Sequence, residues 1–156
     1  MQYYCITFNC SKMDFREYST AILRNNGFKI TKTRCCVLDV LAKSGSSLNA
    51  YEIAARAKKM KVKIDTSTVY RILEAYKKLG LVHFVKEQNG YLACKEFNCR
   101  NEKHCHHQFV CKKCKSVREI HFDDTDFIKS IKAKMPNFQI QNHYFEFLGQ
   151  CAVCKK

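Results

Sequence analysis

The sequence lacks any apolar run that approaches the ~18 residues needed to cross a membrane. Its first residues also lack a basic segment followed by a sustained apolar one, the pattern of a secretory signal peptide. We therefore expect a cytoplasmic protein, in which thiols stay reduced. The 11 cysteines then favour metal binding over disulfide bonds.

Acidic residues are scarce, because 14 Asp and Glu stand against 28 Lys and Arg and leave a net charge of +14. Residues 1–85 hold 15 basic and 6 acidic residues, a net charge of +9. All six histidines lie later, between His83 and His143. A positive field favours a polyanionic partner such as nucleic acid, although a Lys-rich surface can also be merely solvated. Charge in one half and metal-binding side chains in the other indicate two domains with different roles.

Short helices are predicted in the N-terminal half. Apolar spacing places them at residues 15–26, 32–43 and 67–79, with a further helix that begins after Asn49. Asn49 and Glu52 have the spacing of a capping box. The following segment, LVHFVKEQNGYLACK, has two apolar runs around Asn89-Gly90, which predicts a β-hairpin. Helices followed by a hairpin in a basic segment are typical of a winged helix-turn-helix domain, with the last helix in the major groove of DNA.

Two groups of residues are candidates for DNA contacts. The residues of helix 67–79 that lie off its apolar stripe could read bases; they are Ser67, Thr68, Tyr70 and Arg71. Basic residues around the first helices, including Lys29, Lys32 and Arg34, are expected to contact phosphates. Tyr70 and Arg71 could otherwise be ordinary residues of a helix surface.

The C-terminal half predicts a small unit of strands and one helix. Strands are expected at residues 106–111 and 116–122, on both sides of a Cys-Lys-Lys-Cys turn. A helix at 124–135 begins at Asp124 or Thr125 and ends before Pro136, and residues 138–150 alternate as a strand. The unit leaves a sheet edge exposed, and pairing with a second copy of the chain would cover it.

Two Cys-x-x-Cys turns have matching spacing at strand ends. They comprise Cys111 and Cys114, and Cys151 and Cys154. Two such turns can surround one tetrahedral zinc with four thiolates, which is a closed ligand set typical of structural sites. Two unrelated buried pairs are the alternative, but they would leave the matched spacing unexplained.

The chain resembles the ferric uptake regulator (Fur) family of bacterial metal-responsive repressors over residues 14–154. The resemblance is carried by the segments TSTVYRILEAYKKLGLVHFV, HHQFVCKKCKSVREI and NHYFEFLGQCAVC. It implies a mixed α/β fold with a winged-helix DNA-binding domain and a small dimerisation domain that holds a structural zinc. The corresponding division is an extension (1–12), the winged-helix domain (13–88), the wing end and hinge (89–103), and the dimerisation and metal-binding domain (104–156).

Within that family the chain is most similar to the zinc uptake regulators, and this implies a second, regulatory zinc per subunit. The ligands carried over by position are His83, Cys94, His104 and Glu119. A mixed thiolate, imidazole and carboxylate set suits zinc, whereas an iron sensor more often uses only nitrogen and oxygen. Alternate strand residues share a face, so His106 could take the place of His104. Cys99 and Cys105 are nearby thiolates that could compete for the same zinc.

The resemblance also implies a third metal site in the dimerisation domain. Its matching positions are Cys105, His107, Asp126 and His143, with Cys105 where the family usually has histidine. If no metal binds there, these histidines are ordinary strand or surface residues.

The function implied is a zinc-loaded homodimer that binds double-stranded operator DNA and represses zinc-uptake genes. A regulator with the same fold could instead sense iron, peroxide or nickel. A zinc enzyme is disfavoured because the sequence has no His-Glu-x-x-His motif to supply a general base. An RNA-binding module with a purely structural zinc is a further alternative, and its affinity for RNA would not depend on metal.

Overall fold

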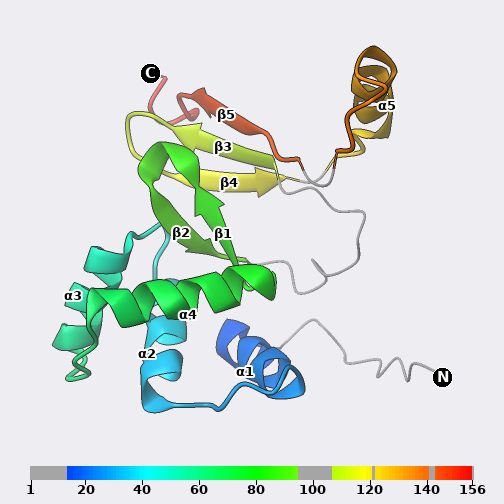
Figure 1. Cartoon of the computed structure of the whole chain (residues 1–156). Helices are drawn as coiled ribbons and strands as arrows, with labels where there is room; N and C mark the ends of the chain where they lie inside the picture. The colour runs from blue at the N-terminus through cyan, green and yellow to red at the C-terminus, as the bar shows by residue number, and fades with distance from the viewer. Residues whose placement is uncertain (1–13, 95–106, 121, 141–142, 156) are drawn as a thin grey trace.

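The computed structural model describes residues 14–94, 107–120, 122–140 and 143–155. Predictions on the first twelve residues and on His104, Cys105 and His106 therefore lie outside the described residues. Two groups of elements follow one another along the chain, four helices with a hairpin and then a three-stranded sheet with one helix (Figure 1). The mixed α/β fold predicted from the sequence is confirmed.

Four helices form the N-terminal half, and in three of them the side chain of the N-cap residue accepts a backbone amide. They are α1 (Phe15–Asn25), α2 (Lys32–Ala42), α3 (Ala50–Lys59) and α4 (Thr66–Lys78). Asn49 and Glu52 form the predicted capping box, with both bonds between side chain and backbone present. Asp65 caps α4 by accepting the amide of Thr68. Gly80 ends α4 with a positive φ of 68°, a conformation that glycine adopts without steric cost.

The helices enclose one apolar core. Leu23, Leu38, Ile53 and Leu73 are fully buried, one from each helix. Tyr76 of α4 is buried beside them, and its hydroxyl donates to the carbonyl of Arg34 at 2.9 Å. This core fixes the buried side of α4, so its opposite side faces solvent.

The predicted hairpin is present, but its connection is longer than an Asn-Gly turn. Strand β1 (Val82–Val85) pairs antiparallel with β2 (Gly90–Ala93), and Val85 lies opposite Gly90. A 3-10 turn, η1 (Lys86–Gln88), joins them, and Asn89 follows with a φ of 46°. Gly90 pairs with Val85 as part of β2, and its Cα packs against the backbone before α3, where a Cβ would lie 3.1 Å from the carbonyl carbon of Leu48.

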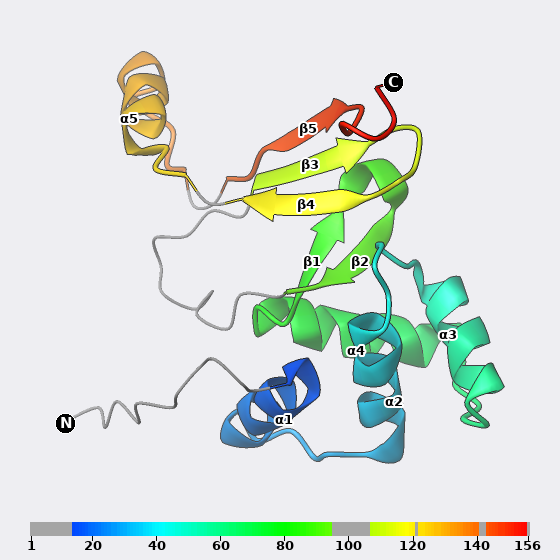
Figure 2. The ribbon, with the colours of Figure 1, turned by 180° about the vertical axis from the view of Figure 1, so that it is seen from behind.

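The C-terminal half is a sheet in which β3 (His107–Cys111) lies between β4 (Val117–Ile120) and β5 (Glu146–Gly149). Strand β3 pairs antiparallel with β4 and parallel with β5. Among the described residues of the predicted strand 138–150, the part that pairs with β3 is Glu146–Gly149, and the carbonyl of Phe145 just before it accepts the amide of Gln108. Helix α5 (Thr125–Lys134) stands off one end of the sheet and has no buried residue (Figures 1 and 2).

The hairpin lies between the helices and the sheet (Figure 2). Its Val85 and Leu92 are buried against Val110 of β3, with Val117 of β4 packed beside them. The two halves therefore meet through a small apolar contact of their own. Within the described ranges, no helix combines the length and the apolar character needed to span a membrane.

Candidate metal centres and nucleic-acid interface

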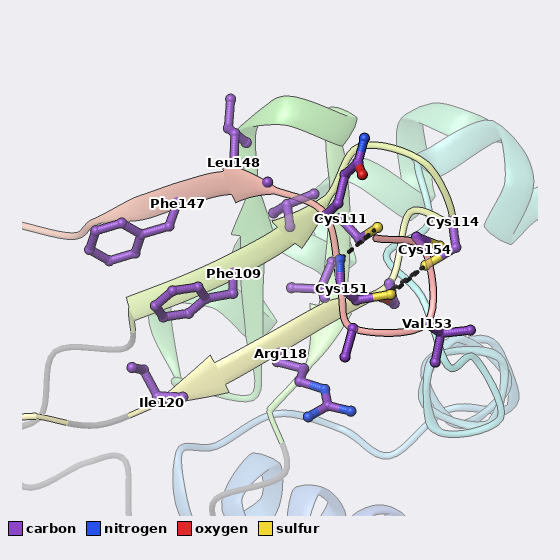
Figure 3. A pocket seen from close by; sticks show the side chains of 16 residues that line it. Phe109, Cys111, Cys114, Arg118, Ile120, Phe147, Leu148, Cys151, Val153 and Cys154 are labelled. Carbon is purple, nitrogen blue, oxygen red and sulfur yellow. Dashed lines mark hydrogen bonds between the residues drawn. The ribbon is translucent and has the colours of Figure 1, made fainter. Parts of the chain in front are cut away.

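The four cysteines of the two Cys-x-x-Cys turns lie together at one end of the sheet (Figure 3). Cys111 ends β3, and Cys151 follows β5, its parallel neighbour. The four sulfur atoms lie within 4.8 Å of one another, and those of Cys114 and Cys151 are 3.7 Å apart. A tetrahedral zinc with Zn–S bonds of about 2.3 Å requires sulfur atoms about 3.8 Å apart, so the spacing fits this ion.

Backbone amides around this cluster favour the thiolate form of Cys111. The amides of Cys114 and Cys151 lower the pKa of Cys111 to about 6, and the amide of Cys151 lies 3.4 Å from its Sγ. Hydrogen bonds from Ser116 lower the pKa of Cys114 as well. The neighbouring sulfur atoms raise the pKa of Cys154 to about 12, since further negative charge is unfavourable there. A divalent cation would offset that repulsion, so the cluster fits a metal electrostatically as well.

A second cluster joins the hairpin to the sheet. The ligand atoms of His83 on β1, Cys94 just after β2, and Glu119 on β4 lie within 4.8 Å of one another. His83 Nε2 is 3.9 Å from Glu119 Oε1, and the Glu119 side chain is only 10% exposed. Three of the four residues matched to a regulatory site are thus brought together, and the fourth, His104, lies outside the described residues.

Two effects on the pKa of His83 oppose each other. Burial lowers the pKa, whereas the hydrogen bond with Cys94 and the charge of Glu119 raise it, and the net effect is a raised pKa. The cluster therefore attracts a positive charge, either a proton on His83 or a metal ion. An imidazole, a thiol and a carboxylate also form the mixed donor set that borderline-soft divalent ions accept.

The third predicted set is only partly assembled. Asp124 Oδ2 lies 2.6 Å from His143 Nε2 and 3.3 Å from His107 Nε2, and His107 is fully buried in contact with the rings of Phe122 and Phe145. Asp126, the predicted member, is 97% exposed and pairs with Lys129. Asp126 lies in the first turn of α5 with its side chain in solvent, whereas Asp124 directly precedes the helix. The sequence predicts that Asp124 stands at the start of the helix, but it does not predict the contact of Asp124 with the two histidines.

The candidate DNA-reading residues of α4 fall into two pairs. The hydroxyls of Ser67 and Thr68 donate to the Asp65 carboxylate at 2.5 and 2.7 Å. These bonds lower the pKa of Asp65 and complete the helix cap. Tyr70 and Arg71 are exposed on the solvent side of α4. The structure therefore leaves Tyr70 and Arg71 more available to a groove than Ser67 and Thr68.

The candidate phosphate contacts also differ among themselves. Lys29 and Lys32 are exposed around the start of α2. Arg34 is half-buried, donates to the carbonyl of Lys29 at 2.6 Å, and lies over the Phe28 ring at 5.2 Å. The Arg34 guanidinium is therefore already bound within the connection between α1 and α2, unlike the exposed Lys29 and Lys32.

Comparisons with known proteins point to one family. The model of the ferric uptake regulator family matches residues 25–148. A ferric uptake regulation protein of Staphylococcus epidermidis is 33% identical over 135 residues, which cover 86% of this chain and 92% of that protein. The zinc uptake regulation protein of Escherichia coli is 27% identical over 134 residues, covering 85% and 77%. A solved zinc uptake regulator complexed with zinc and DNA is 26% identical and covers 92% of this chain and 97% of its own, with a TM-score of 0.79.

Proposed function

The chain belongs to the ferric uptake regulator family, and we propose that it is a zinc-responsive transcriptional repressor that binds operator DNA as a homodimer. The observation that carries the proposal is the cluster of His83, Cys94 and Glu119. Two of its members come from the hairpin of the winged-helix half and one from the sheet. A metal ion held there would link the two halves of the chain.

Cys94 is the residue that favours zinc as the signal. A thiolate donor beside an imidazole and a carboxylate suits zinc, while iron and manganese sensors rely more on nitrogen and oxygen. The likeness to a zinc uptake regulator complexed with zinc and DNA supports the same choice. The identity to a ferric uptake regulation protein keeps iron as the second candidate, with peroxide or nickel as further signals on the same fold.

The regulatory step is an equilibrium between arrangements of the two halves. His83 and Cys94 move with the hairpin, and Glu119 moves with the sheet, so all three donors meet in only one arrangement. Zinc would supply a cation that binds this arrangement more tightly than others, and it can shift the equilibrium only by that difference in affinity. Fixing the halves in two subunits at once would let both α4 helices reach their half-sites together.

The face of the sheet opposite the hairpin supports the homodimer. Phe109 of β3 and Phe147 of β5 stack there at 4.7 Å between ring centroids, and both are more than 40% exposed (Figure 3). The surface continues past the four cysteines to Val153, which is 82% exposed. An apolar surface of this kind on a small domain is typical of one that pairs with a second copy. The four-cysteine site would then hold a structural zinc that fixes the edge of this surface.

The experiment is a DNA-binding titration with buffered metals. A duplex is selected from a random pool with zinc-loaded protein, and its affinity for chelated protein is then measured against free zinc, iron(II), nickel(II) and manganese(II). We expect zinc to restore binding at the lowest free concentration, and Cys94→Ser to raise the zinc concentration required. Tighter DNA binding by the metal-free protein would overturn the repressor model. Restoration of DNA binding by iron at a lower free concentration than zinc would mean that iron, not zinc, is the signal.

A further inference from the structure

The tip of the hairpin makes a second polar attachment to the sheet, separate from the His83, Cys94 and Glu119 cluster. The two carboxylate oxygens of Glu146, the first residue of β5, each accept one backbone amide of the 3-10 turn. Lys86 N lies 2.9 Å from Oε2, and Glu87 N lies 2.8 Å from Oε1. The attachment thus joins groups 59 and 60 residues apart in the sequence.

The chemistry of this contact makes it directional. The first amides of a helical turn have no partner within the turn, so they need an acceptor from elsewhere. An ionised carboxylate is a strong acceptor, and one that takes two adjacent amides fixes the orientation of the turn as well as its position. A single hydrogen bond would leave the hairpin tip free to rotate about it.

The two attachments lie in one row across the sheet. Gln108 of β3 is opposite Glu119 of β4 on one side and opposite Glu146 of β5 on the other. The two glutamates are therefore two strand spacings apart, about 10 Å, on one face of the sheet. Glu119 meets the open end of the hairpin and Glu146 meets its tip, with the buried Val85, Leu92 and Val110 between them.

Gln88 also connects the tip to the turn between β3 and β4 and to the helical half. The side-chain amide of Gln88 donates to the carbonyl of Lys115 at 2.8 Å, next to the Cys111–Cys114 turn. Its carbonyl oxygen accepts a short hydrogen bond from Ser47, in the connection between α2 and α3. A displacement of the tip would therefore be transmitted to the helices that carry the DNA-facing residues.

We infer that Glu146 is a positioning residue for operator binding, which clasps the hairpin tip and sets the orientation of the winged-helix half without a metal. The inference rests on the proposed function, because operator binding is the process that it serves. We call the contact of Glu146 with the amides of Lys86 and Glu87 the clasp. The clasp and the metal cluster hold the same hairpin at two points, so each favours the arrangement that the other requires. By reciprocity, loss of the clasp must weaken metal binding by the same factor that metal binding strengthens the clasp.

The test compares Glu146→Gln with Glu87→Gln. A glutamine has one acceptor oxygen, and its amide group opposes the second backbone N–H, so the clasp loses half of its bonds. Glu87→Gln removes the same charge from the same contact, but from an exposed side chain, because Glu87 takes part only through its backbone amide. Both variants retain the four cysteines, and equal melting temperatures would establish that each is folded.

Three measurements are made on the dimer with its structural zinc. Hydrogen exchange of Lys86 and Glu87 amides reports the clasp, competition with a chelator reports zinc affinity at the His83 cluster, and DNA binding reports the outcome. For Glu146→Gln we expect about tenfold faster exchange, severalfold weaker zinc binding and weaker DNA binding at a fixed free zinc concentration. Glu87→Gln should match wild type in all three.

Unchanged exchange in Glu146→Gln would overturn the clasp. Faster exchange with unchanged zinc affinity would overturn its positioning role, because the contact would then be only local. Failure of the proposed function has a different signature, in which wild-type protein binds DNA equally well with and without zinc. In that case the exchange and zinc measurements still decide whether Glu146 orients the hairpin.

Discussion

At the start of α4, the side chains of Ser67 and Thr68 already have a partner, whereas those of Tyr70 and Arg71 face solvent. A hydroxyl that donates to the Asp65 carboxylate must give up that bond to read a base as a donor. An exposed guanidinium can instead bind a guanine edge through two hydrogen bonds. Base reading by α4 is therefore expected to depend on Arg71 and Tyr70.

Arg71→Ala should accordingly relax the sequence preference, by about 1–3 kcal/mol at one base position. Lys32→Ala should weaken binding to all sequences alike and reduce the salt dependence by about one phosphate contact, because it removes only a backbone contact. Affinities for the selected duplex and for its single-base variants, at several salt concentrations, would distinguish the two. Equal loss on every sequence for both variants would mean that Arg71 does not read bases.

Asp65 gives a pH-dependent prediction at the same helix end. Hydrogen bonds from Ser67 and Thr68 hold the pKa of Asp65 below its ordinary value of 3.8, so its charged form stabilises the folded state. That contribution is complete above about pH 4, where the carboxyl is ionised in both folded and unfolded chains, and is lost as the pH falls through the folded-state value. Asp65→Asn should therefore melt at a lower temperature than wild type at pH 7, and the difference should shrink below pH 4. Melting curves of both proteins between pH 2 and 7 test this, and a constant difference would contradict it.

Among the elements, those whose ends are set by local chemistry could be predicted from sequence. The capping box of Asn49 and Glu52 placed α3, and Gly80 placed the end of α4. Strand β5 is shorter than the prediction, because alternation continues through residues 138–150 while, among the described residues, the ladder with β3 covers Glu146–Gly149. A strand's length is decided by its partner, and the partner is remote in sequence.

The residues of the candidate sites also include some that could be predicted from sequence and others that could not. His83, Cys94 and Glu119 could be selected because their side chains have the chemistry of metal ligands in a recognisable sequence context. Glu146 could not, because its partners are backbone amides of Lys86 and Glu87, and backbone groups leave no residue pattern. The sequence resemblance predicts Asp126 and not Asp124 as the carboxylate of the third site. The position where α5 begins decides which of the two carboxylates faces the histidines.

Gly90 provides a prediction at the scale of the hairpin. A Cβ there would lie 3.0 Å from Ser47 Oγ and 3.1 Å from the Leu48 carbonyl carbon, which belongs to the backbone and cannot easily move. Gly90→Ala should therefore lower the free energy of unfolding by about 1–3 kcal/mol, as overpacking does. Gly45→Ala is the control, since no atom lies within 4 Å of its Cβ position. Urea denaturation of both variants measures the difference, and equal stabilities would mean that the contact relaxes freely.

At the scale of the whole molecule, the sheet has two faces with different roles. Glu119 and Glu146 receive the hairpin on one face, while Phe109 and Phe147 lie exposed on the other. A dimer formed through the apolar face would leave the hairpin face of each subunit accessible. The arrangement of the winged-helix half could then respond to metal without disturbing the dimer contact.

The two metal clusters should consequently lose their ions in a fixed order. The four cysteines all belong to the sheet half, so their ion is held by groups that are already in place. The cluster of His83, Cys94 and Glu119 spans both halves, and part of its binding free energy is used to hold them together. A mild chelator should therefore remove one zinc per subunit and weaken DNA binding more than tenfold, with the circular dichroism unchanged and zinc restoring the affinity.

Removing the second zinc should require strong chelation and should disrupt the sheet half, because metal binding to four thiolates contributes to folding. Zinc release measured by a colorimetric chelator beside circular dichroism follows both steps, and release of both ions in one step with unfolding would contradict this order.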